Sequence, residues 1–305
     1  MPGLRGPAHH GYFADPFVLR VSDGSYAAYG TGGAPGGRPF EVLRSDDLER
    51  WTSHGGALEP LGDPWRTDYW APEVAEAHGA FWMYYSAGHG SEGHTLRVAR
   101  ADAPEGPFRD CGADLTPDER FAIDPSPFRD DDGRWWLFYA HDVLEGERVG
   151  TTVAVAPLDP SMTALAGPGQ TLLRATADWQ VFLREREMYG RVFDRWHTLE
   201  GPFALRRQGR LWMLYSGGNW EQETYGVAAA VADAPEGPWE EPRPGPTVLR
   251  TEPGRLLGPG HCCVVVGPDG SDRLVYHAWN AERTAREMHI DRLVWEPGGP
   301  RVVDR

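Results

Sequence analysis

Three acidic residues of this chain lie in short proline-containing motifs, each of which precedes an apolar segment that ends in tyrosine. The motifs are Ala14-Asp15-Pro16-Phe17, Ile123-Asp124-Pro125-Ser126-Pro127-Phe128 and Leu199-Glu200-Gly201-Pro202-Phe203. Asp15, Asp124 and Glu200 lie fourteen, fifteen and fifteen residues before those tyrosines, which are Tyr29, Tyr139 and Tyr215. This matched spacing predicts that the three carboxylates occupy one equivalent place in three repeats.

Carboxylates that converge repel one another, which raises the pKa of at least one of them. A carboxylic acid that stays protonated beside an ionised carboxylate is what cleavage of a glycosidic bond requires. The alternative for any single motif is a simple turn, and Glu105-Gly106-Pro107 and Glu236-Gly237-Pro238 repeat the tripeptide found at Glu200. Those two copies follow other apolar stretches, so we assign them to peripheral turns.

The elements that must position these residues form an internal repeat. A glycine or turn followed by aromatic and aliphatic residues up to a tyrosine occurs five times, at residues 24–29, 79–85, 133–139, 209–215 and 272–276. A second apolar stretch follows four of the copies, at residues 40–43, 96–99, 152–155 and 226–229. Repeats of roughly 50 to 75 residues are typical of four-stranded propeller blades with insertions.

We therefore predict an all-β fold, a five-bladed β-propeller with four-stranded antiparallel blades around a central channel, formed by residues 1–305 as a single domain. The innermost strands of a propeller line its channel, so equivalent residues of different blades meet there. A β-sandwich with accidental similarity between its strands is the structural alternative.

An ordered set of motifs extends this pattern over nearly the whole chain. It consists of Ala14-Asp15-Pro16, Trp70-Ala71-Pro72-Glu73-Val74, Ile123-Asp124-Pro125-Ser126-Pro127-Phe128, Glu200-Gly201-Pro202-Phe203, Gly258-Pro259-Gly260-His261 and Tyr276-His277-Ala278-Trp279. This set resembles glycoside hydrolase family 43. The resemblance implies an inverting glycosidase with Asp15 as general base, Asp124 as the group that modulates the pKa of the acid, and Glu200 as general acid.

The resemblance also implies the substrate class, a pentose-containing glycoside. We expect an exo-acting α-L-arabinofuranosidase first, with a β-xylosidase or a galactofuranosidase as alternatives on the same scaffold. A non-catalytic carbohydrate-binding propeller would have no need of three phased carboxylates, and a protein-binding scaffold propeller would expose apolar loops instead.

Further residues have a functional and a structural interpretation. The resemblance places His261 near a hydrated Ca²⁺ ion in the channel, although a hydrogen-bonded core histidine is the alternative and calcium prefers oxygen ligands. It also places Arg286 at the sugar, with Arg283 as the competing arginine and a surface salt bridge as the alternative for either. Trp70 is expected to stack on a sugar face. Glu73 is expected to support the catalytic groups by hydrogen bonding, and residues 179–196 form an insertion that either walls the pocket or is a solvated face.

The composition excludes several partners. With 45 acidic and 30 basic residues the net charge is −15, which opposes binding to nucleic acid or to anionic lipid. No disulfide framework can be inferred from Cys111, Cys262 and Cys263. Neither a signal-peptide pattern nor a run of about 18 apolar residues is visible. We expect a small oligosaccharide or glycoside as partner, no organic cofactor and a cytoplasmic location, or a secreted one if a signal peptide has been removed.

Overall fold

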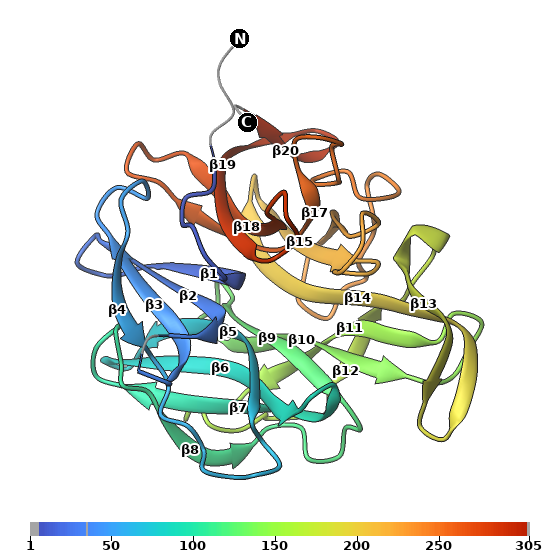
Figure 1. The fold of residues 1–305 in the computed structure, drawn as a ribbon, viewed down its shortest axis with the longest axis horizontal. Helices are drawn as coiled ribbons and strands as arrows, with labels where there is room; N and C mark the ends of the chain where they lie inside the picture. Colours follow the sequence, from blue (N-terminus) through green and yellow to red (C-terminus); the bar gives the residue numbers. More distant parts are fainter. Residues whose placement is uncertain (1–5, 35, 304–305) are drawn as a thin grey trace.

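The computed structural model describes residues 6–34 and 36–303, and within these ranges the chain is made of strands joined by turns. The one helix in this part is a single 3₁₀ turn, η1 (Asp178–Gln180). The chain is all-β, as the sequence predicts (Figure 1). No helix in the described ranges has the length and apolar character needed to cross a membrane.

Three sheets are antiparallel and four-stranded, with neighbours in the order of the sequence. The first contains β1 (Ala14–Arg20), β2 (Tyr26–Gly33), β3 (Pro39–Ser45) and β4 (Thr52–Gly56). The second contains β5 (Asp68–Ala77), β6 (Ala80–His89), β7 (Glu92–Ala101) and β8 (Arg109–Asp114). The last contains β17 (Leu257–Val266), β18 (Asp272–Trp279), β19 (Arg286–Glu296) and β20 (Gly299–Val303).

The remaining strands form one eight-stranded sheet. Its members are β9 (Ala122–Arg129), β10 (Trp135–Val143), β11 (Gly150–Leu158), β12 (Gln170–Leu173), β13 (Val181–Met188), β14 (Arg191–Arg207), β15 (Arg210–Gly217) and β16 (Gly226–Ala232). In this part of the chain the strand pairing does not divide into the separate four-stranded sheets that the sequence predicts. The long strand β14 pairs with β13 and β15, and a short parallel pairing of Gly150 and Thr151 with His197 and Thr198 joins it to β11.

The first strands of the repeats form a closed ring. β1, β5, β9, β14 and β17 contact one another in this order, and β17 contacts β1. Side chains of neighbouring repeats accept hydrogen bonds from backbone amides of this ring: Thr31 from Ala71 at 2.8 Å, Asp124 from Gly201 at 2.9 Å, Ser216 from His261 at 2.7 Å and His277 from Asp15 at 3.0 Å. The last contact links the final sheet to the first and so closes the circle.

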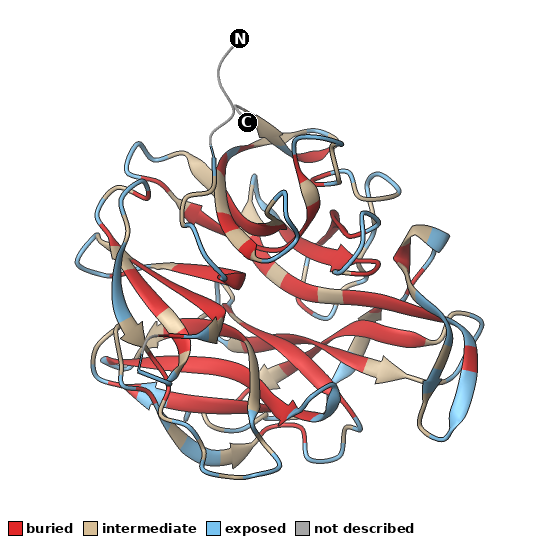
Figure 2. Cartoon of the chain, in the orientation of Figure 1, coloured by how far each residue is buried: buried red, intermediate tan, exposed pale blue. Residues whose placement is uncertain are grey.

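The second strand of each repeat carries the tyrosine that identified it in the sequence. Tyr29, Tyr85, Tyr139, Tyr215 and Tyr276 are all buried, and apolar clusters fill the space between successive sheets. A buried Tyr needs a partner for its hydroxyl, and Tyr276 donates to Asp291 at 2.7 Å. Figure 2 shows the inner strands almost wholly buried, whereas the hairpin of β13 and the start of β14 projects with exposed residues at its tip.

Candidate active site

Each strand of the inner ring is interrupted by an irregularity in its pairing at the same level. At each irregularity one residue has a left-handed backbone: Asp15 (φ 48°), Ala71 (φ 48°), Asp124 (φ 58°), Gly201 (φ 55°) and His261 (φ 45°). This conformation is unfavourable for residues other than glycine by about 1–3 kcal/mol, and such strained positions cluster at functional sites. Bulges of this kind re-aim side chains next to active sites.

The register corrects one detail of the sequence analysis. Asp15 and Asp124 lie at the left-handed position, but Glu200 is the residue before it, because Gly201 has the left-handed backbone. Glu200 therefore corresponds to Trp70 and Ile123 rather than to the two aspartates. The amide of Gly201 donates to Asp124 Oδ2, so the bulge of β14 is fixed by a carboxylate from β9.

A cavity of about 270 Å³ lies at this level of the ring. Six of the residues selected from the sequence line it, and they are Asp15, Trp70, Asp124, Glu200, His261 and Arg286. Tyr12, Thr31, Ile123 and Trp220 complete the wall. The volume is close to the lower end of the range for small-molecule sites, and it fits one monosaccharide unit.

Asp15 is held in its ionised form. Burial alone would raise its pKa, but the Arg286 guanidinium and then His261 outweigh burial and keep the pKa well below the ordinary value. Arg286 donates to Asp15 Oδ1 at 3.2 Å, and its other terminal nitrogen donates to the Tyr12 hydroxyl at 2.7 Å. An ionised carboxylate at neutral pH can accept a proton from water, which is the task of a general base.

Asp124 and Glu200 have the opposite tendency. Burial and then the charge of Glu200 raise the pKa of Asp124 well above its ordinary value. Burial raises the pKa of Glu200 to about 7, although a hydrogen bond from the Tyr225 hydroxyl to Oε1 at 2.7 Å favours the carboxylate. The pocket thus holds an ionised aspartate together with a pair of carboxyl groups that retain a proton near neutral pH.

His277 fixes the backbone of Asp15. Its Nδ1 accepts from the Asp15 amide at 3.0 Å, so the proton of the neutral ring is assigned to Nε2. Burial lowers the pKa of His277 to about 4, in agreement with a neutral imidazole. His277 therefore positions the candidate base without supplying charge.

Other sequence-selected residues lie as follows. Arg283 is exposed and donates to Glu223 at 3.1 Å, away from the pocket that Arg286 lines. Glu73 is buried outside the pocket lining, and burial raises its pKa well above the ordinary value. Trp70 is stacked on the His94 ring, with ring centroids 3.6 Å apart. This stacking covers one face of the indole, while the side chain still lines the pocket.

Replacing Tyr225 by phenylalanine should shift the alkaline limb of the pH–rate profile. A glycosidase that needs ionised Asp15 and protonated Glu200 keeps its activity at mildly acidic pH and loses it as the pH rises through about 7, the pKa of Glu200. The Tyr225 hydroxyl stabilises the carboxylate of Glu200, so its removal raises that pKa. We expect the limb in kcat/KM to move up by roughly half to one pH unit; an unchanged limb would show that Glu200 does not control it.

The model of glycosyl hydrolases family 43 matches residues 4–300. The chain belongs to this family. As a family-43 protein it is a glycoside hydrolase, an assignment that the carboxylate-lined pocket fits.

Relatives within the family carry several activities in their names. The chain is 30% identical over 315 residues to a β-D-galactofuranosidase of Aspergillus niger, with 96% of this chain and 82% of the relative covered. It is 29% identical to an extracellular exo-α-(1→5)-L-arabinofuranosidase of Streptomyces chartreusis, with 87% and 79% covered. A thermostable family-43 glycoside hydrolase has a similar structure, with a TM-score of 0.82, 30% identity and coverage of 95% and 92%.

Several residues of this family-43 site, Thr31 among them, were not selected from the sequence. Tyr12, Trp220 and Tyr225 lie outside the regular strands, where no hydrophobic period predicts the direction of a side chain. The position of His277 could have been predicted from the sequence. It directly follows the buried Tyr276 on β18, so its side chain must point to the other face of that sheet.

Proposed function

We propose that this protein is an inverting, exo-acting α-L-arabinofuranosidase, with Asp15 as general base and Glu200 as general acid. The observation that carries the proposal is the unequal sharing of protons in a pocket the size of one sugar, where Asp15 is held ionised and the pair of Asp124 and Glu200 retains a proton. The named activity of the Streptomyces chartreusis relative supports the choice of sugar.

In the proposed reaction Asp15 removes a proton from a water molecule that attacks the anomeric carbon. Glu200 delivers its proton to the departing glycosidic oxygen from the other side of the ring. Asp124 keeps the pKa of the pair high, and its contact with the Gly201 amide holds the strand segment that carries Glu200. An inverting pair needs a separation of roughly 6.5–9.5 Å, which leaves room for that water.

Arg286 has two tasks in this scheme. Its guanidinium keeps Asp15 ionised, and it lies 4.4 Å above the Trp220 ring at the pocket wall. A planar donor fork suits the neighbouring hydroxyls of a sugar. Trp70, from the other side of the ring of strands, offers an apolar surface for the C–H face of the same sugar.

A wider hollow supports an oligosaccharide as substrate. It measures about 700 Å³ and adjoins the pocket through Tyr12, Thr31 and Trp70, which line both. Asp63, Thr67 and Asp68, which lie just before and at the start of β5, offer oxygen atoms to sugar hydroxyls. A small terminal pocket joined to a broader hollow suits removal of a terminal sugar from a chain.

A β-D-galactofuranosidase is the second candidate, because the Aspergillus niger relative has that name. The two sugars have the same ring configuration, and galactofuranose is larger by an exocyclic CHOH group. The pocket must therefore accommodate one more carbon and hydroxyl for this activity.

A screen of nitrophenyl glycosides tests the proposal. Nitrophenyl α-L-arabinofuranoside should be hydrolysed with a kcat/KM at least tenfold above that for β-D-galactofuranoside and β-D-xyloside. The Asp15→Ala protein, purified in the same way, controls for contaminating activity. Nitrophenol release no faster than this control on every substrate would refute the proposed hydrolysis, and a preference for galactofuranoside would select the second candidate.

We further propose that the fold is a single-domain five-bladed propeller, in which β9–β12 and β13–β16 are two blades joined at their edges. The closed contact order of β1, β5, β9, β14 and β17 supports this count, as does the bulge common to all five strands. The short parallel pairing at Gly150 and Thr151 then links two neighbouring blades.

We propose at most a weak calcium site at His261. Its Nδ1 lies 3.6 Å from Asp15 Oδ1 and 3.7 Å from Asp124 Oδ2, and the described ranges contain no group of three or more His, Cys, Asp or Glu side chains arranged to hold a metal. Calcium takes six to eight oxygen ligands, so these residues do not build a calcium site by themselves and an ion here would be held chiefly by water.

Calorimetric titration of the EDTA-treated protein with CaCl₂ should therefore give a Kd weaker than about 0.1 mM, in the range of weak protein sites. The nitrophenyl glycosidase activity should remain within about twofold after EDTA treatment. Submicromolar binding that His261→Ala abolishes would contradict this interpretation.

A further inference from the structure

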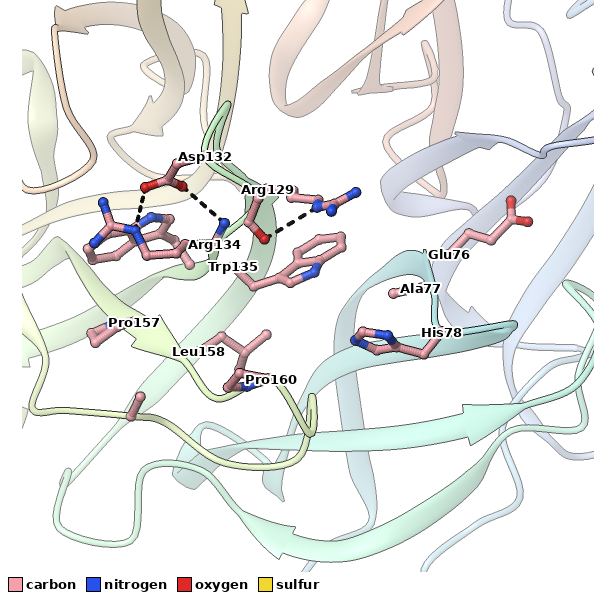
Figure 3. Close-up of a pocket in the computed structure, with 13 residues that line it drawn as sticks. Glu76, Ala77, His78, Arg129, Asp132, Arg134, Trp135, Pro157, Leu158 and Pro160 are labelled. Atoms are coloured by element: carbon pink, nitrogen blue, oxygen red, sulfur yellow. Dashed lines mark hydrogen bonds and ion pairs between the residues drawn. The ribbon is translucent and has the colours of Figure 1, made fainter.

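A second cavity lies at the ends of the inner strands β5 and β9 that are distant from the catalytic pocket. It measures about 480 Å³ and is lined by the turn after β5, the turn between β9 and β10, and the segment that follows β11 (Figure 3). On β5, Ala71 lies at the level of the catalytic pocket and Ala77 lines the second cavity. The spacing of six residues between these positions corresponds to about 20 Å at ~3.3 Å per residue. On β9 it is five residues, from Asp124 to Arg129, or about 16 Å. The cavity is thus separate from the catalytic pocket.

The wall of this cavity has an aromatic surface beside aliphatic ones. Trp135 lines it and is partly exposed, whereas the next residue, Trp136, is buried. Figure 3 shows the Trp135 indole extending from the side of Arg134 toward His78. Pro157, Leu158 and Pro160 line the cavity as well. An indole and proline rings present flat apolar surfaces of the kind on which the C–H face of a sugar packs.

The rim is polar and its charges are balanced. Arg129 and Arg134 supply two cations, and Glu76 and Asp132 supply two anions. Arg134 Nε is 2.5 Å from Asp132 Oδ2, and Arg129 Nε donates to the Gly133 carbonyl at 3.4 Å. Both guanidinium groups keep further N–H donors for a ligand. A phosphate or carboxylate ligand would require an excess of cations, and a lipid would require a closed apolar cavity.

We propose that this cavity is a second carbohydrate-binding site, which holds a neutral oligosaccharide segment against Trp135 without cleaving it. The aromatic surface contacts the sugar ring, and the charged rim binds its hydroxyl groups. The site depends on none of the catalytic residues. Its role would be to keep a polysaccharide chain attached to the protein while the pocket at the other end of the strands acts on chain termini.

Native gel electrophoresis in the presence of soluble polysaccharide tests this proposal. The gels contain linear arabinan or xylan. The reference is the Asp15→Asn protein, which we expect not to degrade the polysaccharide in the gel. It is compared with three proteins that carry Asp15→Asn together with Trp135→Ala, Arg134→Ala or Leu183→Ala. Leu183 is 46% exposed on β13 and does not line the cavity, so it serves as a control for loss of a surface apolar group.

The proposal predicts that at least one polysaccharide retards the Asp15→Asn protein. Trp135→Ala should weaken the apparent affinity at least fivefold and Arg134→Ala about threefold, while Leu183→Ala should not. Arg134 is exposed, so its replacement tests the site even if Trp135→Ala lowers the folding stability. Absence of retardation in both gels, or equal retardation of all four proteins, would refute the site. The proposed function is tested separately, by nitrophenyl glycoside hydrolysis with the protein that retains Asp15. Its result does not depend on whether the second site binds polysaccharide.

Discussion

Replacing Asp15 by alanine is expected to abolish hydrolysis of every glycoside, with a fall in kcat/KM of about 10³- to 10⁴-fold, near the upper end for loss of a general base. Attack by water needs this base whatever the leaving group, so nitrophenyl glycosides and oligosaccharides should be affected equally. The measurement is kcat/KM on one substrate of each kind.

Stability must be controlled in this experiment. Removal of the carboxylate leaves the buried Arg286 guanidinium without its anionic partner, and an uncompensated buried charge destabilises a fold by about 3–5 kcal/mol. Asp15→Asn keeps the shape of the side chain and serves as the second variant, with melting temperatures recorded for both. A folded Asp15→Asn protein that retains more than about a tenth of the activity would remove Asp15 from the role of base.

Replacing Glu200 by alanine should have an effect that depends on the leaving group. An alkoxide that departs from an oligosaccharide needs a proton, so kcat/KM on an arabino-oligosaccharide should fall by about 10²- to 10⁴-fold. A dinitrophenolate is stable without a proton, so the loss on a dinitrophenyl glycoside should be less than about tenfold. The alkaline limb that protonated Glu200 produces should also disappear from the profile measured on the activated substrate.

Equal losses on activated and natural substrates would contradict the assignment of Glu200 as general acid. Tyr225→Phe is the matched comparison, because it removes the hydrogen-bond partner of Glu200 and leaves the carboxyl group in place. It should shift the pH dependence without making the loss depend on the leaving group.

The repeat architecture was predictable because it rests on local patterns. The segments that end in Tyr29, Tyr85, Tyr139, Tyr215 and Tyr276 form β2, β6, β10, β15 and β18, and the four following apolar stretches lie in β3, β7, β11 and β16. Alternation of buried side chains and turn residues fixes such strands within a short window. The joining of two repeats into one sheet was not predictable, since it depends on a tertiary contact between the start of β11 and the middle of β14.

The convergence of Asp15, Asp124 and Glu200 on one pocket was likewise within reach of the sequence, but their register was not. Spacings of fourteen and fifteen residues cannot show where a bulge inserts its extra residue, and so the offset between Glu200 and Asp124 became visible only in the strand pairing. The residues that set the protonation states of Asp15 and Glu200 could be predicted from the sequence only in part, for a related reason. Arg286 lies near the end of the sequence and Tyr225 in a loop, and only the closed ring of strands brings them to Asp15 and Glu200.

The stereochemistry of the first product tests the account most directly. Proton NMR of the anomeric region, recorded in the first minutes of hydrolysis of an α-L-arabinofuranoside, distinguishes the sugar as released from the equilibrium mixture that forms later. If Asp15 activates a water while Glu200 protonates the leaving group, the β-anomer must appear first. Initial appearance of the α-anomer would mean that a carboxylate attacks the sugar itself, and it would contradict the roles proposed for both residues.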